Sequence, residues 1–88
     1  MTRVIEIVNK KGLHARASAK FVQCVEQYDV EVKVTRGAET VGGTSIMGLM
    51  MLAAGMGSIV HVTASGPEAA AALAALAELV ASCFGEEE

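Results

Sequence analysis

One of the two histidines, His14, lies in the stretch GLHARASAK, two residues after Gly12 and two before Arg16. A neutral imidazole is a nucleophile, and a guanidinium presents a planar fork of N–H donors that fits phosphate oxygens. The alanine-rich run that follows predicts a helix beginning beside His14. These residue types in this order fit a histidine that attacks phosphorus and then holds the phosphoryl group.

The predicted helix start supplies further groups that bind anions. The first backbone N–H groups, on Ala15, Arg16 and Ala17, precede the hydrogen-bond ladder, and the helix dipole places partial positive charge there. The same field disfavours a protonated imidazole. Gly12 permits the sharp turn into the helix. A histidine near a helix start beside an ordinary surface arginine has the same local features, so both interpretations stay open on these grounds.

The other residues that could do chemistry have simpler interpretations. His61 is out of phase with Val60 and Val62 in an alternating strand, which predicts a side chain facing solvent. Cys24 and Cys83 fall in helical patterns without CxxC or Cys/His spacing. We therefore expect buried reduced thiols, no disulfide, no metal site and no cofactor, and this use of cysteine favours a cytoplasmic protein.

Length and composition limit the elements that can position these residues. The chain has 88 residues, which is one domain, and its hydrophobic fraction is 52%. A net charge of −3 gives no basic surface for nucleic acid or an anionic membrane. No apolar run approaches the ~20 residues of a membrane span, and the amino-terminal stretch lacks the apolar core of a signal peptide.

Hydrophobic periodicity predicts the order βαββαβα. Alternation or β-rich composition predicts strands at 3–8, 30–36, 39–41 and 58–65, and helical spacing predicts helices at 15–28, 46–52 and 67–84. Pro67 would open the last helix and Gly85 would end it. Strands with one polar face favour an α+β fold, an antiparallel sheet covered by helices on one side only. The EEE tail at 86–88 is expected to be a solvated, frayed end.

The short middle helix is rich in methionine and has Thr44 or Ser45 available as its N-cap. Its apolar residues fit an ordinary core. A helix this short cannot bury every side of itself, so the pattern equally fits a docking surface made by Ile46, Met47 and Met50. Both interpretations remain open from the residues.

Two stretches carry a resemblance to a known family. NKKGLHARASAKFV resembles the phosphorylation-site signature of the histidine-containing phosphocarrier protein (HPr) family of the phosphoenolpyruvate-dependent phosphotransferase system. TSIMGLMMLAAGMGS resembles its second landmark, a serine at the start of a short apolar helix. Length and element order match from end to end. The resemblance implies a single HPr-like domain over residues 1–88, an open-faced β-sandwich with a four-stranded antiparallel sheet and three helices on one face.

The resemblance also implies roles for individual residues. His14 would accept a phosphoryl group from Enzyme I on Nδ1 and pass it to an EIIA-type acceptor, in sugar uptake or nitrogen-related regulation. Arg16 would pair with the phosphate. Ser45 matches the serine that an HPr serine kinase/phosphorylase modifies in some bacterial lineages. The protein would then be a monomeric carrier, not an independent enzyme, with no nucleic-acid or membrane partner.

One position departs from the family pattern. The family usually has proline directly after the arginine, and this chain has Ala17. Alanine restores a backbone N–H that proline removes, so an additional donor could face the phosphate. The alternative function is a purely regulatory binding protein on the same scaffold, acting through Ser45 and the apolar helix. That protein would have no reason to keep His14 and Arg16 behind Gly12.

Overall fold

The computed structural model describes residues 1–85; the expected frayed tail at 86–88 lies outside the described residues. The chain forms seven main elements in the order βαββαβα, followed by a short 3₁₀ turn. Their bounds are β1 Thr2–Glu6, α1 Ala15–Val25, β2 Glu31–Arg36, β3 Glu39–Gly42, α2 Ile46–Met51, β4 Ile59–Ser65, α3 Ala69–Ala81 and η1 Cys83–Gly85. The predicted element order is confirmed.

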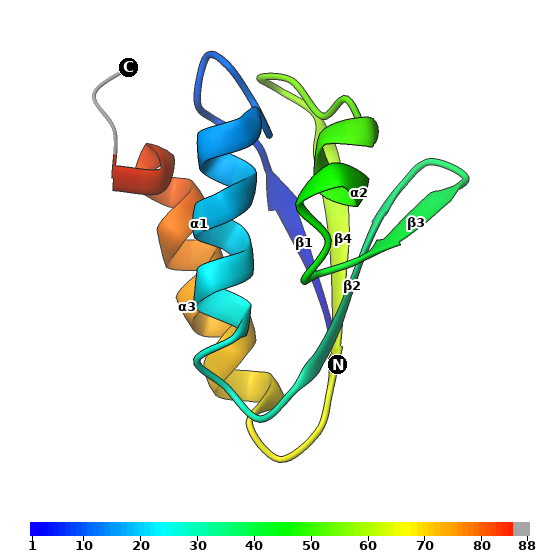
Figure 1. The fold of residues 1–88 in the computed structure, drawn as a ribbon, viewed down its shortest axis with the longest axis vertical. Coiled ribbons are helices and arrows are strands. Elements are labelled where there is room, and N and C mark those ends of the chain that lie inside the picture. Colours follow the sequence, from blue (N-terminus) through cyan, green and yellow to red (C-terminus); the bar gives the residue numbers. More distant parts are fainter. Residues whose placement is uncertain (86–88) are drawn as a thin grey trace.

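The strands form one antiparallel sheet in the order β1-β4-β2-β3 (Figure 1). The central strand β4 places Val62 between Arg3 of β1 and Val34 of β2. Alternate residues of β4 are buried and exposed along its whole length, as the sequence predicts. Helices α1 and α3 run side by side and α2 lies beside α1, so the helices cover one face of the sheet (Figure 1). The α+β architecture predicted from the sequence is confirmed.

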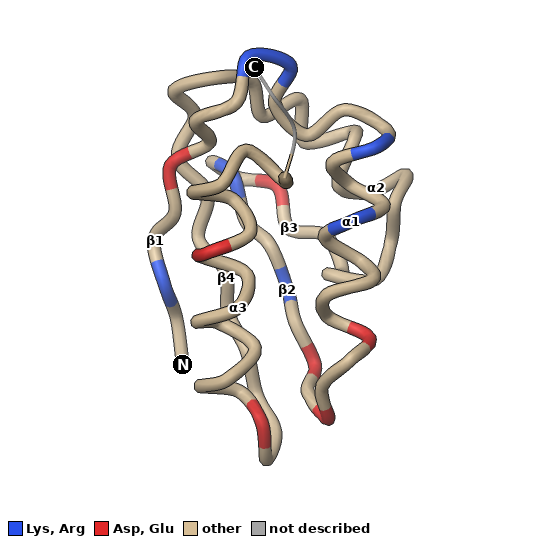
Figure 2. Tube along the Cα trace, turned by 90° about the vertical axis from the view of Figure 1, so that its left-hand side faces the viewer, with Lys and Arg blue, Asp and Glu red and all other residues tan. Residues whose placement is uncertain are grey.

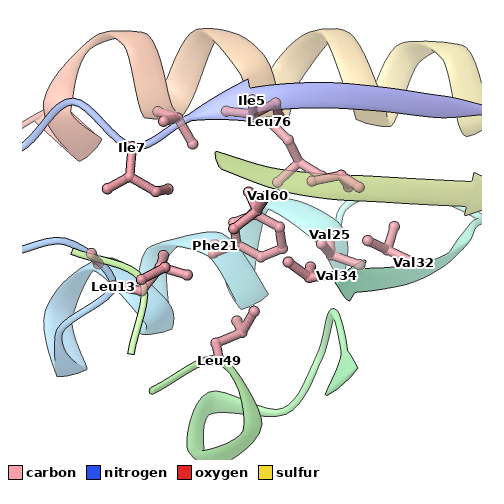
Figure 3. Packing of buried hydrophobic residues seen from close by; sticks show 14 of the residues in the cluster. Ile5, Ile7, Leu13, Phe21, Val25, Val32, Val34, Leu49, Val60 and Leu76 are labelled. Carbon is pink, nitrogen blue, oxygen red and sulfur yellow. The ribbon is translucent and has the colours of Figure 1, made fainter. Parts of the chain in front are cut away.

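The core lies between the sheet and the helices. Figure 3 shows Phe21 of α1 and Leu76 of α3 directed toward Val60 on the covered face of the sheet. Leu49 reaches the same cluster from α2. Leu13, directly before His14, is also part of this core, so the sequence around the histidine is anchored by apolar burial.

Strand β1 and helix α1 both end earlier than the sequence predicts. Strand β1 ends at Glu6, although the next residue stays tied to the loop before β4: the Ile7 N–H donates to the Ser58 carbonyl at 2.8 Å. Helix α1 ends at Val25, and Tyr28 belongs to a tighter turn in which its N–H donates to the Val25 carbonyl. Apolar periodicity continues past both ends, because side chains outside a regular element can still be buried.

The last helix is shorter than predicted at both ends. It begins at Ala69, since Glu68 has a non-helical backbone and its side chain accepts a hydrogen bond from the Asp29 N–H at 2.7 Å. It ends at Ala81, because Cys83 and Phe84 adopt left-handed φ angles that a right-handed helix cannot continue. The Lys20 ammonium donates to the Phe84 carbonyl at 2.7 Å, which fixes this turn with the Phe84 ring buried.

Within residues 1–85, none of the helices combines the length and apolar character needed to cross a membrane.

Candidate functional site

The turn that leads into α1 requires glycine at position 12. Gly12 has a φ of +61°, and a Cβ there would collide with the Ala54 carbonyl oxygen in the loop after α2. The next residue, Leu13, donates its N–H to that same oxygen at 3.0 Å. The loop after α2 therefore holds the start of α1 in place, and the absence of a side chain at Gly12 allows the close approach.

The first turn of α1 is fixed from its buried side as well. Ala17 is fully buried, and the buried Ser18 hydroxyl donates to the Leu13 carbonyl at 3.1 Å. The residues between Leu13 and Ala17 lie on the outer side of this anchored turn: His14 is partly exposed, and Ala15 and Arg16 are exposed. Packing on one side thus presents the histidine on the other.

His14 is the N-cap residue of α1, with extended backbone angles of φ −72° and ψ 178°. Its side chain makes no capping hydrogen bond to the helix; instead, Nδ1 lies 2.9 Å from the carbonyl oxygen of Gly12. A carbonyl can only accept, so Nδ1 carries the hydrogen and donates it in this arrangement. The predicted position of His14 at a helix start is confirmed, and its imidazole is turned back over the preceding turn.

The helix ladder begins after the first turn: the Ser18 N–H donates to the His14 carbonyl at 2.8 Å. The backbone N–H groups of Ala15, Arg16 and Ala17 precede this bond and lie at the positive end of the helix dipole. Arg16 is exposed in the same turn. The structure therefore gathers at the start of α1 the groups that the sequence assigns to anion binding.

Charged residues are distributed unevenly around this site. Figure 2 shows Lys and Arg around the loop before α1 and along α1, whereas Asp and Glu lie on β1, β3 and α3 and at the opposite end of the molecule. At that opposite end, the Asp29 N–H donates to the Glu68 carboxylate. The loop before α1 and α1 itself therefore place positive charge beside His14, although the net charge of the chain is −3.

The second predicted site residue, Ser45, is the N-cap of α2. Its hydroxyl oxygen accepts a hydrogen bond from the Gly48 N–H at 3.0 Å, so Ser45 and not Thr44 fills this role. A Cβ on Gly48 would press against the Ser45 hydroxyl oxygen and against Val41. Ser45 lies at the far end of α2 from the loop that contacts Gly12, about 9 Å along a six-residue helix.

The apolar residues of α2 divide between core and surface. Leu49 and Leu52 are buried, whereas Ile46, Met47 and Met50 are exposed, Met47 to 71%. Met51, which was not predicted to be part of the docking surface, is 69% exposed. Spacing of four residues from Met47 could have identified it, because residues i and i+4 share a helix face.

The remaining candidates lie apart from this site. His61 is exposed on the uncovered face of the sheet, paired in register with Val4 and Thr35, as predicted. Both thiols are free, but Cys24 and Cys83 are only partly buried, and Cys83 lies in the left-handed turn after α3, not in the helix. The expectation of fully buried thiols was therefore wrong.

Burial raises the pKa of the Cys24 thiol, which keeps it protonated and unreactive near neutral pH. Cys24 lines a groove of about 430 Å³ between α1 and α3 that does not include His14. No cluster of three or more His, Cys, Asp or Glu side chains among residues 1–85 could hold a metal ion. The histidine thus lies at the surface, outside that groove.

Two further residues, which the sequence pattern did not single out, bind backbone carbonyls in the site or near it. Asn9 is buried, and its side-chain Nδ2 donates to the Gly12 carbonyl at 2.9 Å. An asparagine three residues before a glycine is typical of a tight turn and could have signalled this. Arg36 donates to the Leu52 carbonyl at 3.1 Å, at the end of α2. No local pattern predicts that contact, because it joins residues 16 positions apart.

Comparison with known proteins identifies the family of this chain. The family model described as "PTS HPr component phosphorylation site" matches residues 1–82. The chain belongs to the HPr family of phosphocarrier proteins. It is 51% identical over 84 residues to phosphocarrier protein HPr of Neisseria meningitidis serogroup A, covering 96% of this chain and 94% of that protein.

A second family member, phosphocarrier protein HPr of Cupriavidus necator, is 48% identical over 88 residues, covering 100% of this chain and 99% of that protein. The crystal structure of HPr-C-His from Thermoanaerobacter tengcongensis matches with a TM-score of 0.94 and 40% identity. This match covers 100% of this chain and 99% of that chain. The family resemblance inferred from the two motifs is confirmed, and so is the HPr fold.

Proposed function

We propose that His14 carries a transient phosphoryl group, which it accepts from phosphorylated Enzyme I on Nδ1 and passes to an EIIA-type acceptor. The observation that carries this proposal is the place of the imidazole at the N-cap of α1, directly before the first-turn N–H groups and the Arg16 side chain. Negative charge is favoured there by the helix dipole and by a nearby guanidinium.

The same features favour a carrier over an independent enzyme. A carrier must present its histidine to two partner proteins in turn, and the partly exposed His14 lies outside the groove between α1 and α3. The chain would act as one monomeric, cytoplasmic domain without a resident cofactor. Each phosphoryl transfer then depends on catalytic groups that the partner supplies, together with the anion-binding start of α1.

Incubation with Enzyme I and phosphoenolpyruvate tests this function. We expect one phosphate that is labile in acid and stable in base, absent from His14→Ala and present in the matched control His61→Ala. Phosphate that persists in His14→Ala and vanishes in His61→Ala would overturn the assignment. Supplying phosphorylated protein with a sugar-specific EIIA and a nitrogen-branch EIIA, and comparing the two transfer rates, assigns the physiological branch.

We further propose that Ile46, Met47 and Met50, joined by Met51, form the apolar part of the partner-docking surface. Their exposure on a short helix next to the His14 turn supports this role, because methionine adapts to several partner surfaces. Ser45 adjoins this surface as the exposed N-cap of α2. Phosphorylation of Ser45 by an HPr serine kinase/phosphorylase would add about −1.5 to −2 charge there and weaken apolar docking.

A further inference from the structure

Asn9 is a polar residue in a buried position, and packing alone does not explain why a polar side chain stands there. Its side chain is 1% exposed, and Oδ1 has no hydrogen-bond partner among the described residues. A buried acceptor without a donor lowers stability, and an apolar residue of similar size would avoid that loss. The amide orientation is fixed by chemistry, since the reverse orientation would face Oδ1 toward the Gly12 carbonyl oxygen.

The contacts of Asn9 meet those of His14 at one atom. The Gly12 carbonyl oxygen accepts from Asn9 Nδ2 and from His14 Nδ1, each at 2.9 Å. Gly12 is buried, and its N–H donates in turn to the Asn9 backbone carbonyl at 3.2 Å. Asn9 thus binds both backbone groups of Gly12, while one of these groups also holds the imidazole.

This shared acceptor conflicts with phosphoryl transfer at Nδ1. While Nδ1 donates its hydrogen to Gly12, the ring lone pair lies on Nε2, and Nδ1 cannot attack phosphorus. The imidazole must leave the Gly12 carbonyl and exchange its tautomer before it reacts. If His14 were the sole donor to the buried Gly12 carbonyl, its departure would leave that carbonyl unpaired, which is costly. The Asn9 amide instead keeps the carbonyl hydrogen-bonded after His14 leaves.

We propose that Asn9 is a positioning residue that eases release of His14 Nδ1 from the Gly12 carbonyl, an inference that rests on the proposed function. Water moves the proton from Nδ1 to Nε2, and the Nδ1 lone pair forms the bond to phosphorus. The bond between phosphorus and the phosphoryl-donor group of Enzyme I breaks, and its electron pair stays on that donor group. Asn9 contacts neither phosphorus nor the donor in this scheme.

The variant Asn9→Leu separates this role from a structural one. It removes the donor and the unpartnered Oδ1 while keeping a similar volume, so its melting temperature should equal or exceed that of the parent. The Gly12 carbonyl would then depend on His14 alone, and the ratio of the Nδ1–H to the Nε2–H tautomer should rise about fivefold, the effect of one hydrogen bond. The imidazole ¹⁵N chemical shifts of the free protein measure this tautomer ratio.

Phosphoryl transfer from Enzyme I should slow by the same factor of about five in single-turnover experiments, with an unchanged Kd for Enzyme I. The matched control is Ser82→Ala, which removes another hydrogen bond from a side chain to a backbone carbonyl, at the end of α3. It should alter neither the tautomer ratio nor the rate.

An unchanged tautomer ratio or an unchanged transfer rate in Asn9→Leu would overturn the proposal. A lower rate accompanied by a lower melting temperature and an unaltered ¹⁵N spectrum would equally overturn it, since that result indicates a structural role. The tautomer measurement uses unphosphorylated protein, so it tests Asn9 even if the proposed function fails. That failure would appear separately, as a parent protein that takes no phosphate from Enzyme I.

Discussion

The two helix starts near the site, those of α1 and α2, use their N-cap residues in opposite ways. Ser45 accepts a hydrogen bond from the Gly48 N–H, so the first turn of α2 is partly satisfied by its own chain. His14 makes no such bond and turns its ring back toward Gly12. The first turn of α1 is therefore not capped by its N-cap side chain, and the helix dipole there favours a negatively charged ligand such as a phosphoryl group.

The difference shows how stability and function are divided between the two ends. A capping side chain such as Ser45 stabilises a protein by about 1 kcal/mol. The start of α1 forgoes that contribution and is instead anchored by the burial of Leu13 and Ala17 and by the hydroxyl of Ser18. The anchor lies on the core side, so the outer side remains available for chemistry.

The largest effect on the α1 side is expected from Arg16→Ala. A charge-assisted contact to phosphate contributes about 1.5–3 kcal/mol, which corresponds to a 10- to 100-fold slower phosphoryl transfer. Thermal denaturation should be almost unchanged, because an exposed arginine adds little to stability. Rapid quench-flow assays with Enzyme I measure the rate of phosphoryl transfer.

The matched control for Arg16 is Lys33→Ala, which removes an exposed cation from β2. Its transfer rate should stay within about twofold of the parent rate at physiological salt, where distant charges are screened. Equal slowing in both variants would assign the effect to long-range attraction and remove Arg16 from the local site.

The α2 side should respond in stability where the α1 side responds in rate. Ser45→Ala loses the cap and should lower the free energy of unfolding by about 1 kcal/mol, whereas Ser45→Asp, which can also cap, should keep it. Ser45→Asp should nevertheless bind Enzyme I more weakly, because its charge must be desolvated against an apolar partner. Urea denaturation and calorimetric titration measure the two quantities. Unfolding of Ser45→Asp, or its full affinity for Enzyme I, would contradict this account.

The smallest effect is expected from Ala17→Pro, which removes one first-turn N–H of α1. Proline is tolerated in the first turn of a helix, so the far-ultraviolet circular dichroism spectrum should not change. Loss of one donor to the phosphoryl group should shorten the lifetime of the phosphohistidine by about fivefold. A lifetime equal to that of the parent would mean that the Ala17 N–H does not face the phosphate.

Most of the fold could be predicted from local pattern. The alternation in β2 and β4 identifies the covered face, because Val34 and Val62 must be buried while Lys33 and His61 must not. The end of α3 could not be predicted in the same way. Phe84 lies four residues after Val80, which fits a continuous helix, but the carbonyl of Phe84 is held by a lysine on α1.

The site was predictable to the extent that its residues are neighbours in sequence. His14, Arg16 and the helix start follow one another, so their chemistry could be inferred together. The role of Asn9 could not be assigned, because its spacing to Gly12 indicates a tight turn but does not show that the Gly12 carbonyl also holds His14. The support from Ala54 is likewise invisible in sequence, since it comes from a loop about 40 residues away.

The most direct test of the contrast between the two helix starts is an amide ¹H–¹⁵N spectrum recorded before and after phosphorylation by Enzyme I. We expect large downfield shifts for the amides of Ala15, Arg16 and Ala17, because they would donate to the phosphoryl oxygens, and near-constant positions for Ile46 and Met47 at the start of α2. Unmoved amides at the start of α1 in a protein that carries the phosphate on His14 would contradict the account.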